Sequence, residues 1–514
     1  MVVVYHQSNA VTKVVPPSKE LLVVDKNKSI AQSILFFASQ FPNSKIVWCH
    51  DSLEDNLNLN EISSLFHHNK MMLSYGLEQT NFLGNSIGYV EESPFININK
   101  KVRYPSWLMS VDVGVIHASV INHISKKIQL DKKFDYFLNS VAKLGMFYGL
   151  FCYSEPQLLV NKTTEIKLTK ASSYELFRFV KQHYKKRWSV LLFLNLLVFE
   201  KRFLILPFLF SWGYRSRKKP LLNFDVIPVQ STLKVVEKKT IDVIIPTIGR
   251  KKYLYNVLQD LAKQTHLPVN VIIAEQNPQQ GSVSELDYLT SEKWPFTIKH
   301  TFTHQAGACN ARNVALGQVE SEWVFLADDD IVFDPSFFEK AIALAQQYQV
   351  SVFTTSCLLV NQKQEYTLIH QSGIFGSGNS FVKTASLQKI RFDEALEFGY
   401  GEDTDFGMQL RNQGHDVIYF PDLKITHLKA PMGGFRIKVK QLWENEVLLP
   451  KPSPTMMYVL LKHYTTQQLR SYKLVLFLKL LKKESVLNYF NFCNSFQKKW
   501  VVSQYWANKI KHEK

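Results

Sequence analysis

Two features that mark other classes of protein are missing from this sequence of 514 residues. Its five cysteines lie far apart, with neither a CxxC pair nor a metal-type spacing, which disfavours a disulfide framework. The N-terminal segment MVVVYHQSNAVTK has no basic stretch followed by an apolar one, and we therefore expect no secretory signal. An apolar fraction of 46% with 20% charged residues excludes a disordered chain. These properties favour a globular cytoplasmic protein with reduced thiols.

Acidic residues are scarce in two segments of the chain, which has a net charge of +17 overall. Residues 161–239 hold 17 Lys/Arg against five Asp/Glu, and residues 436–514 hold 15 against four. The rest of the chain therefore carries a net charge of −6. The positive net charge thus comes from two segments, and the part of the chain that contains the aspartates at 328–330 is not basic.

Both basic segments are also rich in leucine and phenylalanine. The first contains the apolar runs 189–199 and 203–212, and neither reaches the roughly 18–20 residues that cross a bilayer. Residues 472–492 mix Leu, Phe and Lys as a basic amphipathic helix does. This combination favours binding to the surface of an anionic membrane, where each basic residue contributes about 1 kcal/mol. The alternative is that these segments are core helices with charged outer faces.

Strands and helices are expected to alternate after residue 240. The pattern predicts buried strands over 241–250, 269–277 and 322–330, and helices over 252–264 and 308–318. This rhythm is typical of an α/β fold with a mostly parallel sheet flanked by helices. Ligands of such sheets bind beyond the carboxyl ends of the strands. A site is therefore expected where the three strands end, with these polar residues: Thr247, Arg250, Glu275, Asn277, Asp328, Asp329 and Asp330.

The order of these elements resembles the nucleotide-binding half of the GT-A fold of family 2 glycosyltransferases. Three later motifs continue the resemblance in register, at 374–394, 399–421 and 426–436. The resemblance covers roughly residues 241–436. It implies an enzyme that transfers a sugar from a nucleotide-sugar donor to a hydroxyl group, with inversion at the anomeric carbon.

A divalent cation is expected at the aspartate run. Side chains alternate along an extended strand, so Asp328 and Asp330 share one face while Asp329 points the other way. Two carboxylates on one face suit Mg²⁺ or Mn²⁺. The resemblance implies that Asp330 is a direct ligand (a DXD motif), that Asp328 shares the metal or contacts ribose, and that His427 completes the site. An acidic surface turn and a structural histidine are the alternatives.

The segment 401–414 begins with acidic residues and is expected to form a helix that ends at Gly414. The resemblance makes Asp403 the general base for the acceptor hydroxyl and places Glu402 beside it, in contact with the acceptor. The plainer interpretation is that both residues cap the helix, which contributes about 0.5–1 kcal/mol. The two interpretations are compatible.

The remaining site residues are expected to hold the donor. The resemblance assigns Thr247, Arg250 and Glu275 to the base and ribose, although many relatives have aspartate where this chain has Glu275. Arg312 could bind phosphate through its two-pronged guanidinium, or form a packing salt bridge. Gly376 and Gly378 would allow the backbone to approach the sugar closely, or form a plain turn.

Residues 1–160 show a fainter version of the same plan. The segment 44–53 resembles the third strand with a single acid, Asp51, and 133–145 can be aligned on 402–414 so that Lys133 and Phe134 replace Glu402 and Asp403. The prediction is a degenerate GT-A-like domain without catalysis, which could hold the acceptor; an unrelated α/β domain is the alternative.

The predicted organisation therefore has four parts: an α/β domain (1–160), a basic helical linker at the membrane surface (161–239), the catalytic domain (240–436) and a basic helical region (437–514). The expected protein is a glycosyltransferase on the inner face of the membrane, peripherally bound, with a glycan acceptor such as a lipid-linked surface-polysaccharide precursor. A sugar-phosphate nucleotidyltransferase is disfavoured because no GxGxRL-type loop is found. A nucleic-acid-binding protein is suggested only by the pI of about 9.3.

Overall fold

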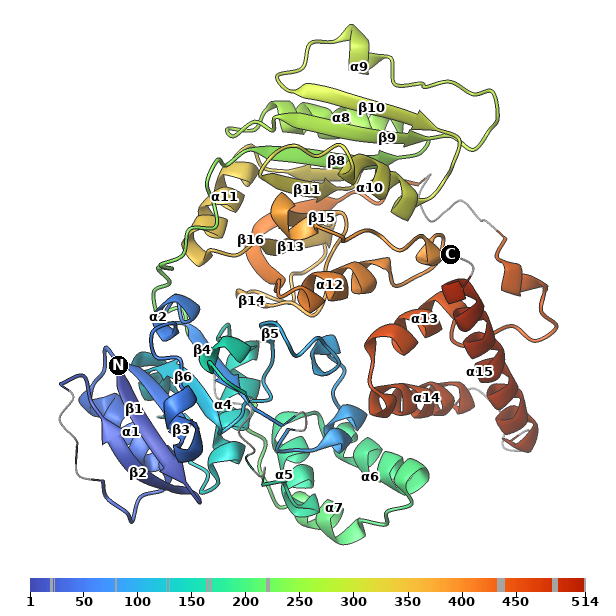
Figure 1. The fold of residues 1–514 in the computed structure, drawn as a ribbon. Helices are drawn as coiled ribbons and strands as arrows, with labels where there is room; N and C mark the ends of the chain where they lie inside the picture. Colours follow the sequence, from blue (N-terminus) through green and yellow to red (C-terminus); the bar gives the residue numbers. More distant parts are fainter. Residues whose placement is uncertain are drawn as a thin grey trace. The chain divides into compact units, whose positions relative to one another are not determined.

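The structure is a computed structural model in which the chain is described except at a few short segments. These are residues 19–21, 23, 79–80, 126, 129, 163–165, 167–168, 219–221, 432–439, 483–488 and 513–514. The expected end of the catalytic domain at 436 therefore lies outside the described residues. The chain divides into two compact units, coloured along the sequence in Figure 1. Unit 1 comprises Met1–Leu233 and Thr465–Leu476, and unit 2 comprises Lys234–Tyr464 and Phe477–Lys514.

Unit 2 is built on a nine-stranded sheet in the order β10-β9-β8-β11-β15-β13-β16-β12, with β14 beside β16. Its strands are β8 (Ile241–Thr247), β9 (Asn270–Gln276), β10 (Thr297–Thr303), β11 (Trp323–Ala327), β12 (Ile331–Phe333), β13 (Val352–Leu359), β14 (His370–Gln371), β15 (Asn379–Lys383) and β16 (Ile418–His427). The four strands from β10 to β11 are parallel, as the alternation of elements predicted. Beyond β11 the sheet is mixed, because β15 runs antiparallel to both of its neighbours while β13 and β16 are parallel.

The helices of unit 2 are α8 (Lys251–Ala262), α9 (Tyr288–Ser291), α10 (Ala308–Leu316), α11 (Phe337–Tyr348), α12 (Glu402–Asn412), α13 (Pro454–His463) and α15 (Tyr489–His512). Helix α14 (Thr466–Leu481) begins in unit 1 and ends in unit 2. The central strands β8 and β11 are buried along their length, which explains their continuous apolar sequences. The helix predicted over 252–264 buries its predicted face against the sheet. Gly414 follows α12 with φ +93°, the left-handed conformation expected where a helix ends.

Unit 1 has a seven-stranded sheet in the order β2-β1-β3-β6-β4-β7-β5. Its elements are β1 (Val2–Gln7), β2 (Ala10–Val15), α1 (Ile30–Gln40), β3 (Lys45–His50), α2 (Ile62–Leu65), β4 (Met71–Tyr75), β5 (Tyr104–Pro105), β6 (Val113–His117), α3 (Ala118–Ser125), α4 (Phe134–Phe147), β7 (Phe151–Ser154), α5 (Ser173–His183), α6 (Lys186–Glu200) and α7 (Ile205–Ser211).

The two sheets share one pattern of strand pairing. The spatial order β1-β3-β6-β4-β7-β5 matches β8-β11-β15-β13-β16-β14, and the matched strands follow one another in the same order along the chain. Each matched pair also agrees in direction: parallel, antiparallel, antiparallel, parallel and antiparallel. The sheets differ at one edge, where the hairpin strand β2 stands in place of β9 and β10, and beside β16, where unit 2 has the additional strand β12. Unit 1 therefore repeats the order and directions of six strands of unit 2.

The segment 161–233 does not form a separate linker. Helices α5 and α6 contribute Phe177, Phe179, Leu192 and Leu196 to the core of unit 1. Residues 465–476 of the expected C-terminal region also belong to unit 1, because Gln468 and Ser471 donate hydrogen bonds to backbone carbonyls at positions 89–93. Unit 1 is thus larger than the sequence pattern indicated.

Candidate functional site

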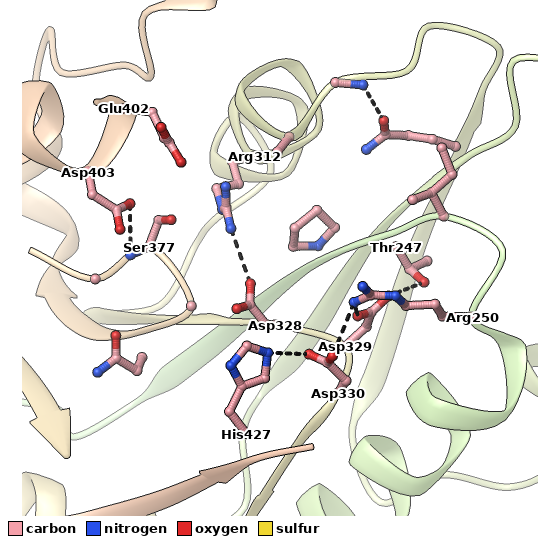
Figure 2. A pocket seen from close by; sticks show the side chains of 18 of the residues that line it. Thr247, Arg250, Arg312, Asp328, Asp329, Asp330, Ser377, Glu402, Asp403 and His427 are labelled. Carbon is pink, nitrogen blue, oxygen red and sulfur yellow. Dashed lines mark hydrogen bonds and ion pairs between the residues drawn. The ribbon is translucent and has the colours of Figure 1, made fainter. Parts of the chain in front are cut away.

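A pocket of about 540 Å³ opens at the carboxyl ends of β8 and β11 in unit 2 (Figure 2). Its walls include the start of α10, the loop before β15, the start of α12 and the end of β16. It is lined by all but one of the side chains predicted to bind donor, metal or acceptor: Thr247, Arg250, Arg312, Asp328, Asp330, Gly376, Gly378, Glu402, Asp403 and His427. The exception is Glu275.

Strand β11 ends at Ala327, so the three aspartates lie in the turn between β11 and β12, and the strand predicted over 322–330 is shorter than expected. The alternation expected of a strand therefore does not apply to them: all three line the pocket, and Arg250 lies 3.4 Å from Asp330 as well as contacting Asp329. The carboxylate of Asp329 accepts hydrogen bonds from Thr247 Oγ1 at 2.7 Å and from an Arg250 guanidinium nitrogen at 2.6 Å. Burial raises the pKa of Asp329 to about 6, although Arg250 and Thr247 oppose the shift. Thr247 and Arg250 thus orient the aspartate run, in addition to the donor contact expected of them.

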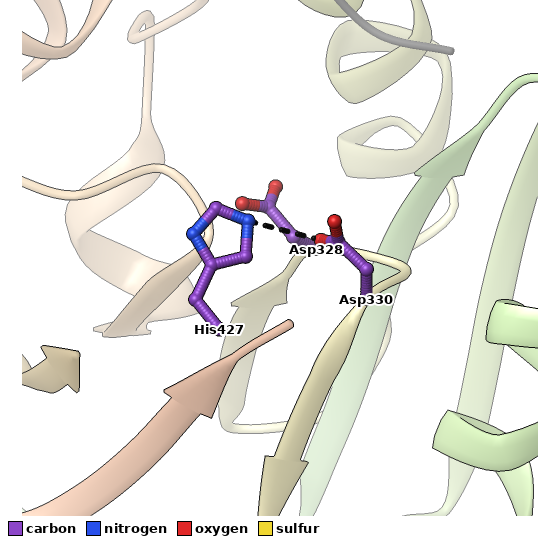
Figure 3. A group of neighbouring side chains, drawn as sticks. All are labelled: Asp328, Asp330 and His427. Atoms are coloured by element: carbon purple, nitrogen blue, oxygen red, sulfur yellow. Dashed lines mark ion pairs between the residues drawn. The ribbon is translucent and has the colours of Figure 1, made fainter. Parts of the chain in front are cut away.

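Asp328, Asp330 and His427 form a cluster whose candidate ligand atoms all lie within 4.8 Å of one another (Figure 3). Nε2 of His427 lies 3.2 Å from Oδ1 of Asp330. The other oxygen of Asp330 accepts the backbone N–H of Ala430 at 2.7 Å, which holds the chain after β16 against the aspartate run. Burial favours neutral Asp330, but His427, the Ala430 N–H and Arg250 outweigh it and lower the pKa of Asp330.

The cluster fits a divalent cation. Oδ1 of Asp330 is buried without a well-directed hydrogen bond, which is costly unless another group binds it. Two carboxylates and an imidazole are a ligand set suited to Mn²⁺, and to Mg²⁺ through the carboxylates. The close contact with the Asp330 carboxylate raises the pKa of His427, and the proton it favours would compete with a cation for Nε2.

The glycines before β15 leave room for Asp328. A Cβ atom on Gly378 would lie 2.2 Å from Oδ2 of Asp328, and one on Gly376 would lie 1.9 Å from Oδ1 of Asn379. The backbone at these glycines thus approaches the side chains of Asp328 and Asn379 closely, whereas the prediction was a close approach to the sugar. On its other side, Asp328 lies 3.1 Å from a guanidinium nitrogen of Arg312, which is the salt bridge considered for this arginine.

Replacing Gly378 with alanine is expected to displace Asp328, because the added methyl group would overlap its carboxylate. Transfer should fall about 100-fold, a loss comparable to removing one stabilising group from an active site. The measurement is activity together with the melting temperature. Gly373→Ala is the matched control, since its Cβ would meet nothing within 4 Å. Equal activities of the two variants would contradict the role given to Gly378.

Across the pocket, Glu402 and Asp403 occupy the first turn of α12. Oδ1 of Asp403 accepts the backbone N–H of Ser377 at 3.2 Å. Burial raises the pKa of Asp403, against the opposing effects of Arg312 and Ser377. Burial, followed by the charge of Asp403, raises the pKa of Glu402 to about 7. Two adjacent carboxyls with raised pKa values are suited to proton transfer near neutral pH.

Helix α12 is fixed to α13 from behind. The buried carboxylate of Asp405 contacts His463 Nε2 and Lys462 Nζ, both at 2.6 Å. Gly401 at the helix start has φ +113°, and its Cβ would lie 2.5 Å from Val459. These contacts position Asp403 rigidly relative to the rest of unit 2.

Glu275 lies in a smaller neighbouring pocket of about 130 Å³, which also contacts Thr247 and Arg250. Its carboxylate is held by His300 Nε2 at 2.9 Å and by the backbone N–H of Glu285 at 3.3 Å. The predicted donor residues therefore line two adjoining spaces.

The sequence analysis missed Glu397. Its carboxylate accepts the backbone N–H groups of Cys309 at 3.0 Å and Asn310 at 2.9 Å, so it caps α10 from a distant part of the chain. It also lines the pocket, as do Gln276 and Lys429. The acidic residues around 393–403 weakly indicate a site, but they do not indicate that Glu397 caps the distant helix α10.

Comparison with known proteins agrees with this geometry. Residues 242–396 match the family model described as glycosyl transferase family 2. An uncharacterized glycosyltransferase of Haemophilus influenzae is 29% identical over 129 residues, which are 24% of this chain and 42% of that protein. One of Rickettsia felis is 25% identical over 148 residues, 29% of this chain and 24% of that protein. The chain thus matches less than half of the length of either relative.

Among solved structures, Staphylococcus aureus TarS 1–349 in complex with UDP is 22% identical, with a TM-score of 0.31, covering 37% of this chain and 61% of that chain. TarS 1–349 is 16% identical, with a TM-score of 0.34, covering 54% of this chain and 92% of that chain. Such scores do not by themselves establish a shared overall fold. The family model matches residues 242–396, which lie in unit 2, and both relatives are named as glycosyltransferases, so this part of the chain is similar to family 2 glycosyltransferases.

Proposed function

We propose that unit 2 is a metal-dependent inverting glycosyltransferase that moves a sugar from a nucleotide-sugar donor to a hydroxyl of a glycan. The observation that carries this proposal is one pocket with the Asp328–Asp330–His427 cluster and Asp403, the candidate base on α12. A cation site and a base are the two groups that such a transfer requires.

The donor is proposed to lie across the two adjoining pockets. Its base and ribose would contact Glu275, Thr247 and Arg250 in the smaller space. Its diphosphate would face Arg312 and the cluster. Mn²⁺ or Mg²⁺ held by Asp328, Asp330 and His427 would offset the charge that builds on the diphosphate as the sugar departs.

The acceptor is proposed to bind beside α12. Its hydroxyl oxygen attacks the anomeric carbon from the face opposite the departing nucleoside diphosphate, and Asp403 takes the hydroxyl proton. The raised pKa of Asp403 makes it a better proton acceptor than an ordinary carboxylate. Attack from the opposite face inverts the anomeric configuration. Glu402 would contact the acceptor beside the base.

The test is a donor screen on the full chain. UDP-, GDP- and dTDP-sugars are incubated with and without Mn²⁺, and the released nucleotide is measured. We expect one nucleotide class to be cleaved, and only with the cation. A chain that cleaves none of the donors would contradict the proposal, whereas transfer of a nucleotidyl group to a sugar phosphate would identify a nucleotidyltransferase.

We also propose that unit 1 binds the cytoplasmic surface of a membrane and that the acceptor is lipid-linked. Around α7, five large apolar side chains are exposed, with Phe203 and Phe210 each 66% accessible, and they form the α7 patch: Phe203, Leu206, Leu209, Phe210 and Trp212. Exposed basic residues precede and follow it in the sequence, at Lys185–Arg187, Lys201, Arg202, Arg215 and Lys218. Exposed apolar side chains together with exposed basic ones suit an anionic leaflet. Within the described residues, no helix combines the length and apolar character needed to cross a bilayer.

Only part of the segment 161–239, which was predicted to lie at the membrane surface, is proposed to contact lipid. Helix α6 buries Trp188, Leu192 and Leu196, so the first apolar run belongs largely to the core. Arg217 is buried and binds Asp131 at 2.6 Å, so it is a core ion pair and not a lipid contact. Lys219 lies outside the described residues.

Replacing Phe203, Leu206 and Phe210 with serine is expected to lower binding to phosphatidylserine vesicles at least tenfold, since buried apolar area contributes about 25 cal/mol per Å². Binding of the wild type should also weaken with salt. The measurement is vesicle co-sedimentation. The matched control replaces Phe147, Val160 and Val226, three exposed apolar residues elsewhere in unit 1. Wild-type protein that ignores the vesicles would contradict this proposal and remove the main support for a lipid-linked acceptor.

A further inference from the structure

Unit 1 has a pocket of its own, of about 430 Å³, which the mechanism above does not use. It lies at the ends of β1 and β3, just before β6 and at the start of α4, where it is lined by His6, His50, Asp112 and Asp135. In the shared strand pattern, β1, β3 and β6 match β8, β11 and β15, whose corresponding ends line the site of unit 2. The two pockets therefore occupy equivalent places in their sheets.

The acceptor side of the site is retained in unit 1. Helix α4 precedes β7 as α12 precedes β16, and Asp135 is the second residue of α4 just as Asp403 is the second of α12. The helix starts therefore pair Asp135 with Asp403, one position away from the sequence alignment that put Phe134 in the place of Asp403. Oδ1 of Asp135 is buried and has no hydrogen-bond partner. Burial, followed by the charge of Asp112, raises the pKa of Asp135 to about 7. Near neutral pH this carboxyl can accept a hydrogen bond from a ligand or donate one to it.

The donor side is missing. Unit 1 has no counterpart of β9 and β10 among its described strands, and α1, which precedes β3 as α10 precedes β11, contains no Lys or Arg to match Arg312. The aspartate run is reduced to Asp51, which accepts the hydroxyl of Thr12 at 2.6 Å. The described residues hold one group suited to a metal ion, and it lies in unit 2. A nucleoside diphosphate would find neither its cation nor its phosphate ligands here.

The lining suits an uncharged, hydroxyl-rich molecule. Gln7, Ser8, Asn9 and Ser52 supply amide and hydroxyl groups at the rim, beside the two imidazoles and two carboxyls, and Phe134 and Ile30 add apolar surface. Burial lowers the pKa of His6 to about 4, so its ring is neutral. Lys133, the lysine of the lining, forms an ion pair with Glu175 at 2.6 Å. An anionic ligand would therefore meet the carboxyls of Asp112 and Asp135 without a lysine to offset them.

We propose that this pocket of unit 1 binds an uncharged sugar residue of a glycan without reacting with it. A polar lining with a few apolar contacts and a volume within the 300–1,000 Å³ range of ligand pockets supports this assignment. Because the site lacks the donor half of the fold, it would hold a chain and leave the transfer to unit 2. The binding itself does not depend on the reaction proposed for unit 2.

The test is saturation-transfer-difference NMR on the full chain without nucleotide, using the methyl glycosides of glucose, galactose and N-acetylglucosamine. We expect at least one glycoside to bind, with an apparent Kd that rises at least tenfold in Asp135→Asn. Ser52→Trp, which fills the exposed rim, should have the same effect if Asp135→Asn fails to fold. Ser63→Trp, at an exposed serine of α2 outside the pocket, is the matched control. Melting temperatures establish that the variants are folded.

Asp403→Asn separates the two pockets, because it alters only unit 2 and should leave this binding intact. The proposal is overturned if no glycoside binds, or if binding is lost in Asp403→Asn and kept in both unit 1 variants. It is also overturned if UDP with Mn²⁺ or inorganic phosphate binds in a way that Ser52→Trp abolishes, since the pocket would then be an anion site.

Discussion

Replacing Asp330 with alanine is expected to abolish sugar transfer, and EDTA should abolish it in the wild type. Asp330 is 1% exposed and lies between Arg250, His427 and the chain after β16, so no other side chain can take over its place. Without it the cluster keeps two of three ligands. The charge that builds on the departing diphosphate would then be less well stabilised, and turnover is expected to fall by about 100- to 1,000-fold or more. The measurement is the rate of transfer at saturating donor, with Mn²⁺ added back after chelation.

Two controls make this result specific. Asp330→Asn keeps the size of the side chain and an acceptor for the Ala430 N–H, so it tests the loss of charge with less disturbance of the fold. Asp334→Asn changes an exposed aspartate four residues away and should be neutral. Full activity of the wild type in EDTA would refute the cation site.

Asp403→Asn should lower turnover at least ~100-fold while donor binding survives. The amide matches the carboxylate in shape, and it can still accept the Ser377 N–H, but it cannot take the proton of the acceptor hydroxyl. Donor affinity is measured by nucleotide titration, and product configuration by NMR, where inversion is expected. A larger loss in Glu402→Gln than in Asp403→Asn would show that the neighbouring carboxyl is the base.

The pH profile offers a second check on the base. Burial raises the pKa of Asp403, and a base must be deprotonated to act, so turnover should fall as the pH drops through this raised pKa. The acidic limb should therefore lie above the pH of about 4 that is typical of an exposed aspartate. Glu402, with a pKa of about 7, contributes to the same limb, and Glu402→Gln should change its shape.

Much of unit 2 could be predicted because its signals are local. The buried strands and the helix over 252–264 follow from apolar periodicity. The two-residue repeat of a strand did not predict the orientation of Asp329, because β11 ends at Ala327 and the aspartates lie in the turn that follows. The resemblance extended these local signals to His427 and Asp403, which the structure brings to the same pocket as the aspartates.

Other features depend on residues that are far apart in the chain. The partner of Arg250 is Asp329, the helix capped by Glu397 begins at Ala308, and Gly378 is required by Asp328 fifty positions earlier. No periodic pattern records such contacts, since each depends on which strand ends and loops meet. The same holds for Arg217, whose charge suggested lipid but which pairs with Asp131 in the core of unit 1.

The sequence by itself predicted which strand the aspartates follow and which helix start carries Glu402 and Asp403. These properties follow from the conformation of single elements, which short stretches of side chains specify. Only the tertiary structure decided how strands pair, because register and order in a sheet depend on buried contacts between distant segments. It therefore revealed that unit 1 repeats the strand order of unit 2, that helices α5 and α6 contribute to its core, and that it has a pocket where unit 2 has its site.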